Sequence, residues 1–197
     1  MICLDWGVAT LMLPGQRSCG DQHLVCATSE GTLVAVVDGL GHGEEAAAAA
    51  GVAISVLEKN AEMNVISLVR RCHDNLRDMR GVVMSLASFN ARDAVLSWIG
   101  VGNVEGVLLR GNGETDRETL LLRGGVVGGQ LPPLQAAILP VVSGNTLIFA
   151  TDGVHDGFAR EARPNDSPQE LAERILARYA RGTDDALVLV ARYKGGG

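Results

Sequence analysis

The amino-acid sequence predicts an α+β protein in which antiparallel sheets are covered by helices. Strand-like and helix-like segments come in separate runs, which argues against a doubly wound parallel sheet. The connections between the strand-like segments in the middle of the chain are too short for the helical crossovers that parallel strands require. No linker interrupts the pattern, so we expect residues 1–197 to form a single domain with a frayed tail at 194–197.

The N-terminal part of the chain is predicted to hold three strands and then two helices. The strands are expected over 2–13, 23–28 and 32–37, because these apolar runs are separated by turn signals at Pro14-Gly15 and Glu30-Gly31. An alanine run with two glutamates in its first turn predicts a helix over 43–59, and apolar residues on one face predict another over 64–79.

The rest of the chain is predicted to return to strands, with one more helix. Apolar, β-branched segments separated by Gly and Asn favour an antiparallel meander of four strands, at 82–89, 94–101, 104–109 and 119–122. After a Gly/Pro-punctuated stretch (124–144) comes a strand at 146–150. The sequence Ser167-Pro168-Gln169-Glu170 is a capping box that should begin a helix running to about Arg181, and a buried strand is expected at 186–193.

Charge and composition exclude several classes of protein. The chain has 17 Lys and Arg against 23 Asp and Glu, a formal net charge of −6, and only 4% aromatic residues. It therefore lacks the positive surface and the stacking side chains of a nucleic-acid-binding protein. The longest largely apolar stretch, 46–57, is shorter than the about 20 residues of a membrane span, and the N-terminus lacks the positive charge of a signal peptide. We expect a cytoplasmic protein with neither nucleic acid nor membrane as a partner.

Two distant segments repeat one pattern, in which an apolar strand delivers Asp-Gly, an aliphatic residue, two more positions and a glycine. They are V-V-D-G-L-G-H-G, with Asp38, and A-T-D-G-V-H-D-G, with Asp152. A single Asp-Gly after a strand is a common turn. Its recurrence favours a site for a hard cation, because each aspartate stands at the end of a strand and the glycine lets the backbone carbonyl approach an ion. We therefore predict that Asp38 and Asp152 are metal ligands.

Two further acidic positions extend this set. Asp21 follows a glycine in the turn before the second strand, and Asp184-Asp185 stands directly before the last strand. Each alone is better explained as a turn or cap residue. Together with Asp38 and Asp152 they make an all-oxygen set, which suits Mg²⁺ or Mn²⁺ better than zinc. Two such ions would orient a phosphoryl group and activate a water molecule without a protein nucleophile.

Three motifs in this order resemble the metal motifs of the PPM (PP2C) serine/threonine phosphatases: D-G-L-G-H-G at Asp38, T-D-G-V at Asp152, and T-D-D at Asp184. The D-G-x-G-H-G and T-D-G-V forms are most similar to the bacterial SpoIIE-like branch. The resemblance implies a PP2C-like αββα sandwich, with two antiparallel sheets packed together and flanked by helices. It also implies hydrolysis of phosphoserine or phosphothreonine with two divalent cations, Mn²⁺ or Mg²⁺.

The resemblance assigns roles to individual residues. Asp38 and Asp152 would be bridging or direct metal ligands, Gly39 a carbonyl ligand, Asp184 a ligand, and Asp21 the acid of the first motif. Asp185 stands where many relatives have Asn, so which member of the tandem pair binds metal is open, and Asp184 is favoured.

Two residues beyond the acids are candidates for catalysis. Arg17 lies four residues before Asp21, the spacing of the phosphate-gripping arginine in the eukaryotic enzymes, although a solvated loop arginine is an equal explanation. His42 is a hydrogen-bond donor to a metal ligand, a proton carrier to the leaving serine oxygen, or a polar residue completing the glycine turn. The glycines of 124–129 resemble a glycine-rich segment of the same branch or form a mobile loop.

The chain is expected to be a catalytic domain alone, because its first predicted strand starts at Ile2. This resembles the short members of the branch that dephosphorylate STAS-domain proteins of the stressosome in bacterial stress signalling, which makes such phosphoproteins the expected partners. Two alternatives remain: a catalytically inactive PPM fold that acts as a binding module, and a dinucleotide-binding enzyme that uses Gly39-x-Gly41-x-Gly43.

Overall fold

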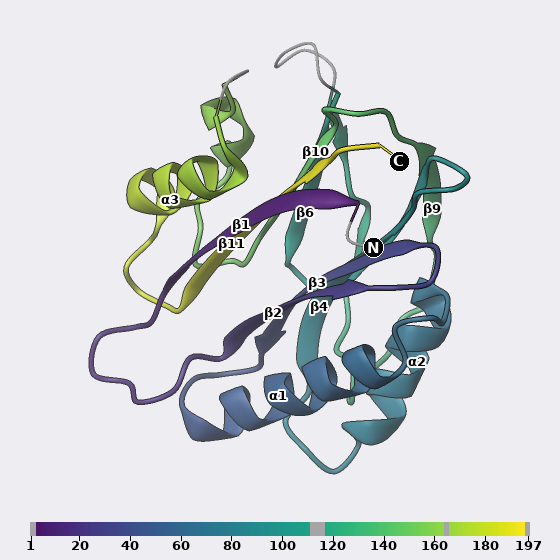
Figure 1. Ribbon diagram of the computed structural model, residues 1–197. Helices are drawn as coiled ribbons and strands as arrows, with labels where there is room; N and C mark the ends of the chain where they lie inside the picture. The colour runs from purple at the N-terminus through teal and green to yellow at the C-terminus, as the bar shows by residue number, and fades with distance from the viewer. Residues whose placement is uncertain (1–2, 111–116, 164–165, 196–197) are drawn as a thin grey trace.

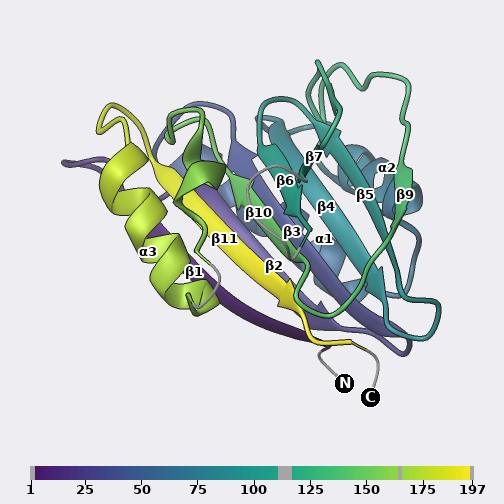
Figure 2. The same cartoon turned by 90° about the horizontal axis from the view of Figure 1, so that it is seen from above.

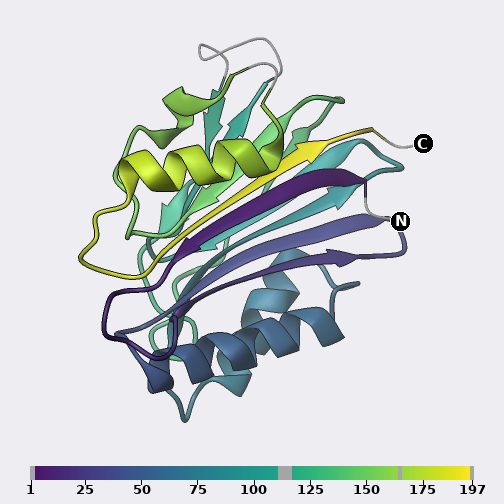
Figure 3. The same cartoon turned by 60° about the vertical axis from the view of Figure 1, so that its left-hand side comes forward.

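Two β-sheets lie face to face between helices, in a computed structural model that describes residues 3–110, 117–163 and 166–195 (Figure 1). One helix covers the outer face of one sheet, and two helices cover the outer face of the other, as Figure 3 shows. The predicted α+β class and the expected PP2C-like αββα sandwich are confirmed.

The first sheet has the strand order β1-β11-β10-β6-β7, and its neighbouring strands are antiparallel. Its strands are β1 (Leu4–Leu11), β6 (Glu105–Leu109), β7 (Arg117–Thr119), β10 (Thr146–Ala150) and β11 (Ala186–Tyr193). The predicted last strand is therefore buried between β1 and β10. Because Leu4 pairs with Tyr193, the two ends of the described chain lie side by side (Figure 2). The backbone of Lys194 still donates to the carbonyl of Cys3, and residues 196–197 of the expected frayed tail lie outside the described residues.

The second sheet has the order β2-β3-β4-β5-β8, with β9 paired to β5. Its strands are β2 (Asp21–Ala27), β3 (Gly31–Gly39), β4 (Val82–Asn90), β5 (Val95–Val101), β8 (Leu122–Arg123) and β9 (Ala137–Pro140). β3 is apolar almost throughout because it is covered on both faces, by the other sheet and by helices.

The predicted four-stranded meander is wrong in two respects. β4 and β5 form a hairpin, but β6 crosses to the other sheet and pairs with β10. The strand expected at 119–122 is two short strands in different sheets, and β8 pairs with β5 in parallel. Leu120 is buried between the sheets where the chain changes sheet, so an apolar run that looks like one strand serves both.

The helices are α1 (Glu44–Lys59), α2 (Val65–Asn75), the 3₁₀ turn η1 (Phe158–Glu161) and α3 (Pro168–Tyr179). The capping box at Ser167 and Glu170 begins α3 as predicted. α2 ends earlier than predicted, and residues 76–79 form turns instead. α1 begins after Gly43, whose φ of 79° is favourable for glycine only, without a side-chain cap.

Three apolar layers hold the elements together. The central layer lies between the sheets and includes Phe89, Leu96, Phe149 and Leu189. A second layer joins α1 and α2 to the β2–β5 sheet, and a third joins α3 and η1 to the β1–β11 sheet. No helix among the described residues is long and apolar enough to cross a membrane.

Candidate active site

The five aspartates singled out in the sequence come from both sheets and gather at one end of the sandwich. Asp21 begins β2 and Asp38 lies near the end of β3, and the two are directly paired across these antiparallel strands. Asp152 follows β10, and Asp184 and Asp185 precede β11 in the other sheet. Each aspartate therefore stands where a strand begins or ends, and the packing of the two sheets brings the two groups together.

A cavity of about 520 Å³ opens at this end of the sandwich. Asp38, Asp152 and Asp184 line it together with His42 from the loop before α1. The other lining residues are Leu13, Leu40, Gly41, Val83, Gly102, Asn103, Gly124 and Thr183. Asp21 and Asp185 are buried, each with about 5% of its surface exposed, so they lie beneath the exposed members of the cluster.

Thr151 joins the two sheets under the cluster. Its hydroxyl donates a hydrogen bond of 2.7 Å to Oδ2 of Asp21 in β2, and it accepts one of 2.9 Å from the backbone of Leu187 in β11. A buried hydroxyl with both functions satisfied fixes the position of the Asp21 carboxylate. The sequence analysis gave Thr151 no role of its own.

Asp185 serves the backbone of the loop between β1 and β2. Its Oδ1 accepts from the backbone N–H of Leu13 and its Oδ2 from that of Gly20, both at 2.7 Å. A buried carboxylate whose two oxygens receive short bonds from the chain is a clamp, and it holds the turn that delivers Asp21. Asp184 is exposed and faces the cavity, so the two members of the tandem pair have different surroundings.

The glycines of the repeated Asp-Gly pattern are required by close packing. A Cβ at Gly39 would lie 2.1 Å from the backbone oxygen of Ala46 in α1, and one at Gly153 would lie 1.9 Å from the backbone oxygen of Asp185. Neither glycine has a positive φ. At both positions glycine is needed because a neighbouring backbone segment packs against the residue that follows the aspartate. The sequence pattern does not reveal this reason for glycine.

Asn103 is a site residue that the sequence analysis missed. It lies in the turn between β5 and β6, and its Nδ2 donates a hydrogen bond of 2.8 Å to Oδ2 of Asp152. The turn is held on both sides, because Gly102 N–H donates to the carbonyl of Arg123 and the buried Ser85 hydroxyl donates to that of Val104. The segment G-V-G-N-V, in which a glycine precedes a polar residue between two strands, was the available signal.

Burial and mutual repulsion raise the pKa values of two aspartates in the cluster. Burial, with the charges of the neighbouring aspartates, raises the pKa of Asp38 to about 8. Burial also raises the pKa of Asp21 to about 7, although the hydrogen bond from Thr151 opposes the rise. The charges that act on both groups come from other aspartates, so the cluster holds unbalanced negative charge.

The donor chemistry of this cluster fits a hard divalent cation, since carboxylate oxygens and a backbone carbonyl are the ligands that Mg²⁺ and Mn²⁺ prefer. Nevertheless, within 3–110, 117–163 and 166–195, no three His, Cys, Asp or Glu side chains form a ready-made group of ligands. Thr151 holds the carboxylate of Asp21, Asn103 that of Asp152, and two backbone amides that of Asp185 by hydrogen bonds. The aspartates nevertheless act on one another electrostatically, as the raised pKa values of Asp21 and Asp38 show.

The structure separates the other two candidates. His42 lines the cavity, whereas Arg17 is exposed and is not among the lining residues described for it. The glycine segment at 124–129 is tied down, because Val127 exchanges two backbone hydrogen bonds of 2.9 Å with Val82 and Gly128 N–H donates to Nδ1 of His73. This segment brings Gly124 to the cavity.

Comparison with known proteins agrees with this architecture. The family model described as Stage II sporulation protein E (SpoIIE) matches residues 28–194. The phosphoserine phosphatase RsbX of Bacillus subtilis (strain 168) is 24% identical over 176 residues, which cover 89% of this chain and 87% of RsbX.

Solved structures show the same likeness over nearly the whole chain. A chain of "The bacterial stressosome: a modular system that has been adapted to control secondary messenger signaling" is 32% identical with a TM-score of 0.88, over 96% of this chain and 99% of that one. RsbX in complex with magnesium is 24% identical with a TM-score of 0.85, over 96% and 94%.

The fold and the site define a phosphoprotein phosphatase of the PP2C type. Within that class, the chain belongs to the SpoIIE family, as the sequence motifs indicated. Both alternatives are thereby set aside: the protein is an enzyme, and the strands on either side of β3 are antiparallel, which a dinucleotide-binding β-α-β unit does not allow.

Proposed function

We propose that the protein hydrolyses phosphoserine or phosphothreonine on a partner protein, with two divalent cations, Mn²⁺ or Mg²⁺, as cofactors. The observation that carries this proposal is the gathering of five aspartates from both sheets, three of which line one cavity. The neighbouring charges that raise the pKa values of Asp21 and Asp38 are those of other aspartates. Such a cluster is costly by itself and favourable around cations.

The residues that would hold the cations are those that expose oxygen to the cavity or lie directly beneath it. We assign this role to Asp21, Asp38, the carbonyl of Gly39, Asp152 and Asp184. When bound, the cations supply a water molecule of lowered pKa as the nucleophile and offset the charge of the phosphoryl group.

Asp185 has a different part in this proposal. Because both of its oxygens already accept backbone N–H groups, we assign it to holding the β1–β2 turn and Asp184 to metal binding. The position of Asp184 at the cavity supports this choice within the tandem pair.

We assign His42 to protonation of the leaving group. Its side chain is exposed at the cavity, on the loop between β3 and α1, so it can donate a proton to the serine or threonine oxygen as the phosphate ester breaks. In this proposal the acids bind the cations, while His42 acts on the protein side of the scissile bond.

For the partner, we propose phosphorylated STAS-domain proteins of a stressosome. The support is the likeness to RsbX and to a chain whose structure is described under the bacterial stressosome, in both cases over nearly the whole chain. The cytoplasmic location expected from the sequence stays a prediction.

The test uses p-nitrophenyl phosphate and a phosphoserine peptide as substrates. We expect phosphate release with Mn²⁺, loss of activity on chelation, and a decrease in kcat of at least about 100-fold in Asp38→Asn, which removes a charged group at the reacting centre. Asp78→Asn, at an exposed aspartate after α2, is the matched control and should retain full activity. Activity that survives both chelation and Asp38→Asn would disprove the metal-dependent mechanism.

A further inference from the structure

An arginine side chain lies at the rim of the cavity, and it is not Arg17, the arginine that the family resemblance suggested. Among the described residues that line the cavity there is no Lys or Arg, and the three charged lining residues are aspartates. Arg80, in the segment between α2 and β4, reaches the rim from outside. A Cβ built on the lining residue Gly41 would lie 2.6 Å from Nη1 of Arg80.

The guanidinium is held in this place by an ion pair. Nε of Arg80 lies 2.5 Å from Oε2 of Glu45 in the first turn of α1. The pair occupies one edge of the planar group, while Nη1 extends over Gly41 beside the cavity. The contact also gives a reason for glycine at position 41, which has a φ of 89° and whose missing side chain leaves room for the guanidinium.

The segment that carries Arg80 is firmly attached to the walls of the cavity. The carbonyl of Gly81 accepts a hydrogen bond of 3.0 Å from the backbone of Leu40, a lining residue. On the other side, Val82 exchanges backbone hydrogen bonds with Val127 in the glycine-rich segment. Arg80 therefore lies close to three segments at the cavity rim: the loop before α1, the start of β4 and the glycine-rich segment.

The stability of the fold does not depend on the ion pair between Arg80 and Glu45. About 52% of the Arg80 side chain and 71% of the Glu45 side chain are exposed, and exposed pairs contribute little to folding. A phosphoryl group has more charge than a carboxylate and matches the fork of a guanidinium. Arg80 can therefore exchange Glu45 for a substrate anion at little cost.

We propose that Arg80 binds the phosphoryl group of the substrate at the mouth of the cavity, a part that the family resemblance assigned to Arg17. This inference rests on the proposed function, because it names a substrate contact of the same site. Glu45 then acts as a competing partner that keeps the guanidinium oriented before substrate arrives.

The test measures KM and kcat at saturating Mn²⁺ with p-nitrophenyl phosphate and with phosphoserine peptides that have neutral or acidic flanks. We expect Arg80→Ala to raise KM about tenfold for every substrate, the effect of losing one hydrogen bond to a charged group. Arg80→Lys should be intermediate because it keeps the charge and loses the fork, and Glu45→Gln should lower KM.

Arg77→Ala is the matched control, because Arg77 lies in the same segment, is similarly exposed and pairs with Asp74. Its KM, and that of Arg17→Ala, should equal the wild-type value. An unchanged KM in Arg80→Ala would overturn the inference. An increase in KM confined to the acidic peptides would also overturn it, because Arg80 would then bind carboxylates of the peptide and not the phosphoryl group. Calorimetry of inorganic phosphate with the Mn²⁺-loaded protein tests the same contact without turnover, so failure of the proposed reaction and failure of this contact are distinguishable.

Discussion

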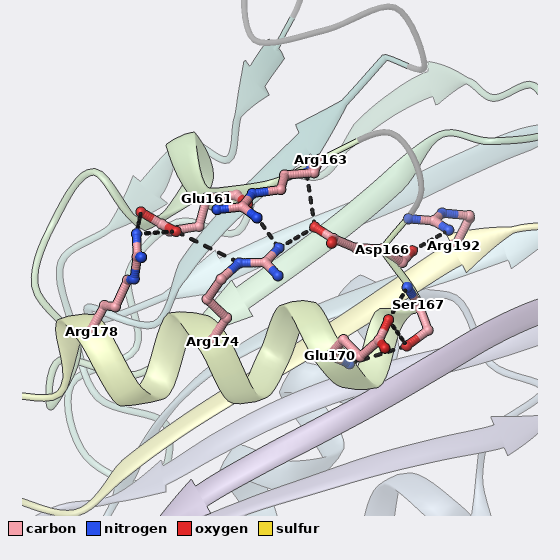
Figure 4. Close-up of polar contacts among 8 residues, drawn as sticks. All are labelled: Glu161, Arg163, Asp166, Ser167, Glu170, Arg174, Arg178 and Arg192. Atoms are coloured by element: carbon pink, nitrogen blue, oxygen red, sulfur yellow. Dashed lines mark hydrogen bonds and ion pairs between the residues drawn. The ribbon is translucent and has the colours of Figure 1, made fainter.

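In the described part of the chain, the acidic cluster at the end of the sandwich and the charged cluster beside α3 differ in their balance of charge. At the end of the sandwich, five aspartates lie together, and burial with mutual repulsion raises the pKa values of Asp21 and Asp38. Beside α3, by contrast, acids and arginines alternate (Figure 4). There, burial acts to raise the pKa of Asp166, but hydrogen bonds from Arg174 and from the backbone of Arg163 hold it below its usual value.

In the cluster beside α3, acids and arginines pair with one another. Arg174 contacts both Asp166 and Glu161, and Arg178 reaches Glu161 from the next turn of the helix at 3.0 Å. These contacts tie η1 and the segment before α3 to the helix, and the Tyr179 hydroxyl also donates to Glu161. Among the described residues, each of these acids lies against an arginine of α3.

The difference separates a structural cluster of charges from a binding one. A network that stabilises the fold pairs its charges within the chain, whereas a site for cations keeps acids together and lacks the balancing charge. Removing a charge should therefore lower the stability of the fold in the balanced cluster and raise it in the acidic cluster of the metal-free protein.

Breaking the balanced cluster should have the largest effect on stability. Arg174→Ala leaves Glu161 and Asp166, each with only 12% of its side chain exposed, without their shared partner. We expect a loss of about 2 kcal/mol in the free energy of unfolding, between the values for exposed and for fully buried pairs, measured by urea denaturation. Arg178→Ala, whose side chain is 57% exposed, is the matched control and should cost less than about 1 kcal/mol. Equal losses in the two variants would contradict the distinction.

Within the acidic cluster, Asn103→Ala should weaken metal binding without unfolding the protein. It removes the hydrogen bond that orients the Asp152 carboxylate. We expect about a tenfold weaker affinity for Mn²⁺, typical for the loss of a partner behind a metal ligand, measured by calorimetry. The matched control is Asn75→Ala, which removes an exposed bond to the α2 backbone. An unchanged Mn²⁺ affinity in Asn103→Ala would show that Asp152 is held without it.

A smaller effect should appear in the pH dependence of the metal-free protein. Because the pKa of Asp38 is raised in the folded state, that state binds more protons than the unfolded chain between about pH 4 and pH 8. The free energy of unfolding therefore falls as pH rises through this range. Asp38→Asn removes this term and part of the repulsion that acts on Asp21, so the variant should gain roughly 1 kcal/mol relative to wild type between pH 5 and pH 8.5.

Thermal unfolding of both proteins in chelator, across this pH range, measures the effect. Asp166→Asn supplies the opposite control, because its pKa is lowered in the folded state and it should destabilise the protein at pH 8.5. A stability difference between Asp38→Asn and wild type that stays constant with pH would rule out a raised pKa at Asp38.

Most of the fold was predictable because its elements have strong local signals. The alanine-rich α1 and the capped α3 follow from helix propensity and from the capping box at Ser167 and Glu170. The change of sheet at Leu120 was not predictable, because a buried residue between two packed sheets looks the same as one in the middle of a strand.

The candidate site shows the same limit. Asp38 and Asp152 were found through a repeated local pattern, and their common cavity agrees with that interpretation. Asn103 and Thr151 have no such repeat, and their importance comes from partners 49 and 130 residues away along the chain. For the arginines, the local signal pointed elsewhere: sequence spacing suggested Arg17, whereas Arg80 lies beside the cavity rim.

The sequence by itself determined the class of fold, the repeated Asp-Gly turns and the family motifs, because turns, caps and periodicity depend on residues close together in the chain. Only the tertiary structure decided which carboxylate clamps the backbone and which faces the cavity, as with Asp185 and Asp184. It also decided which arginine approaches the site. These choices depend on how two sheets pack, and the side chains that meet there come from opposite ends of the chain.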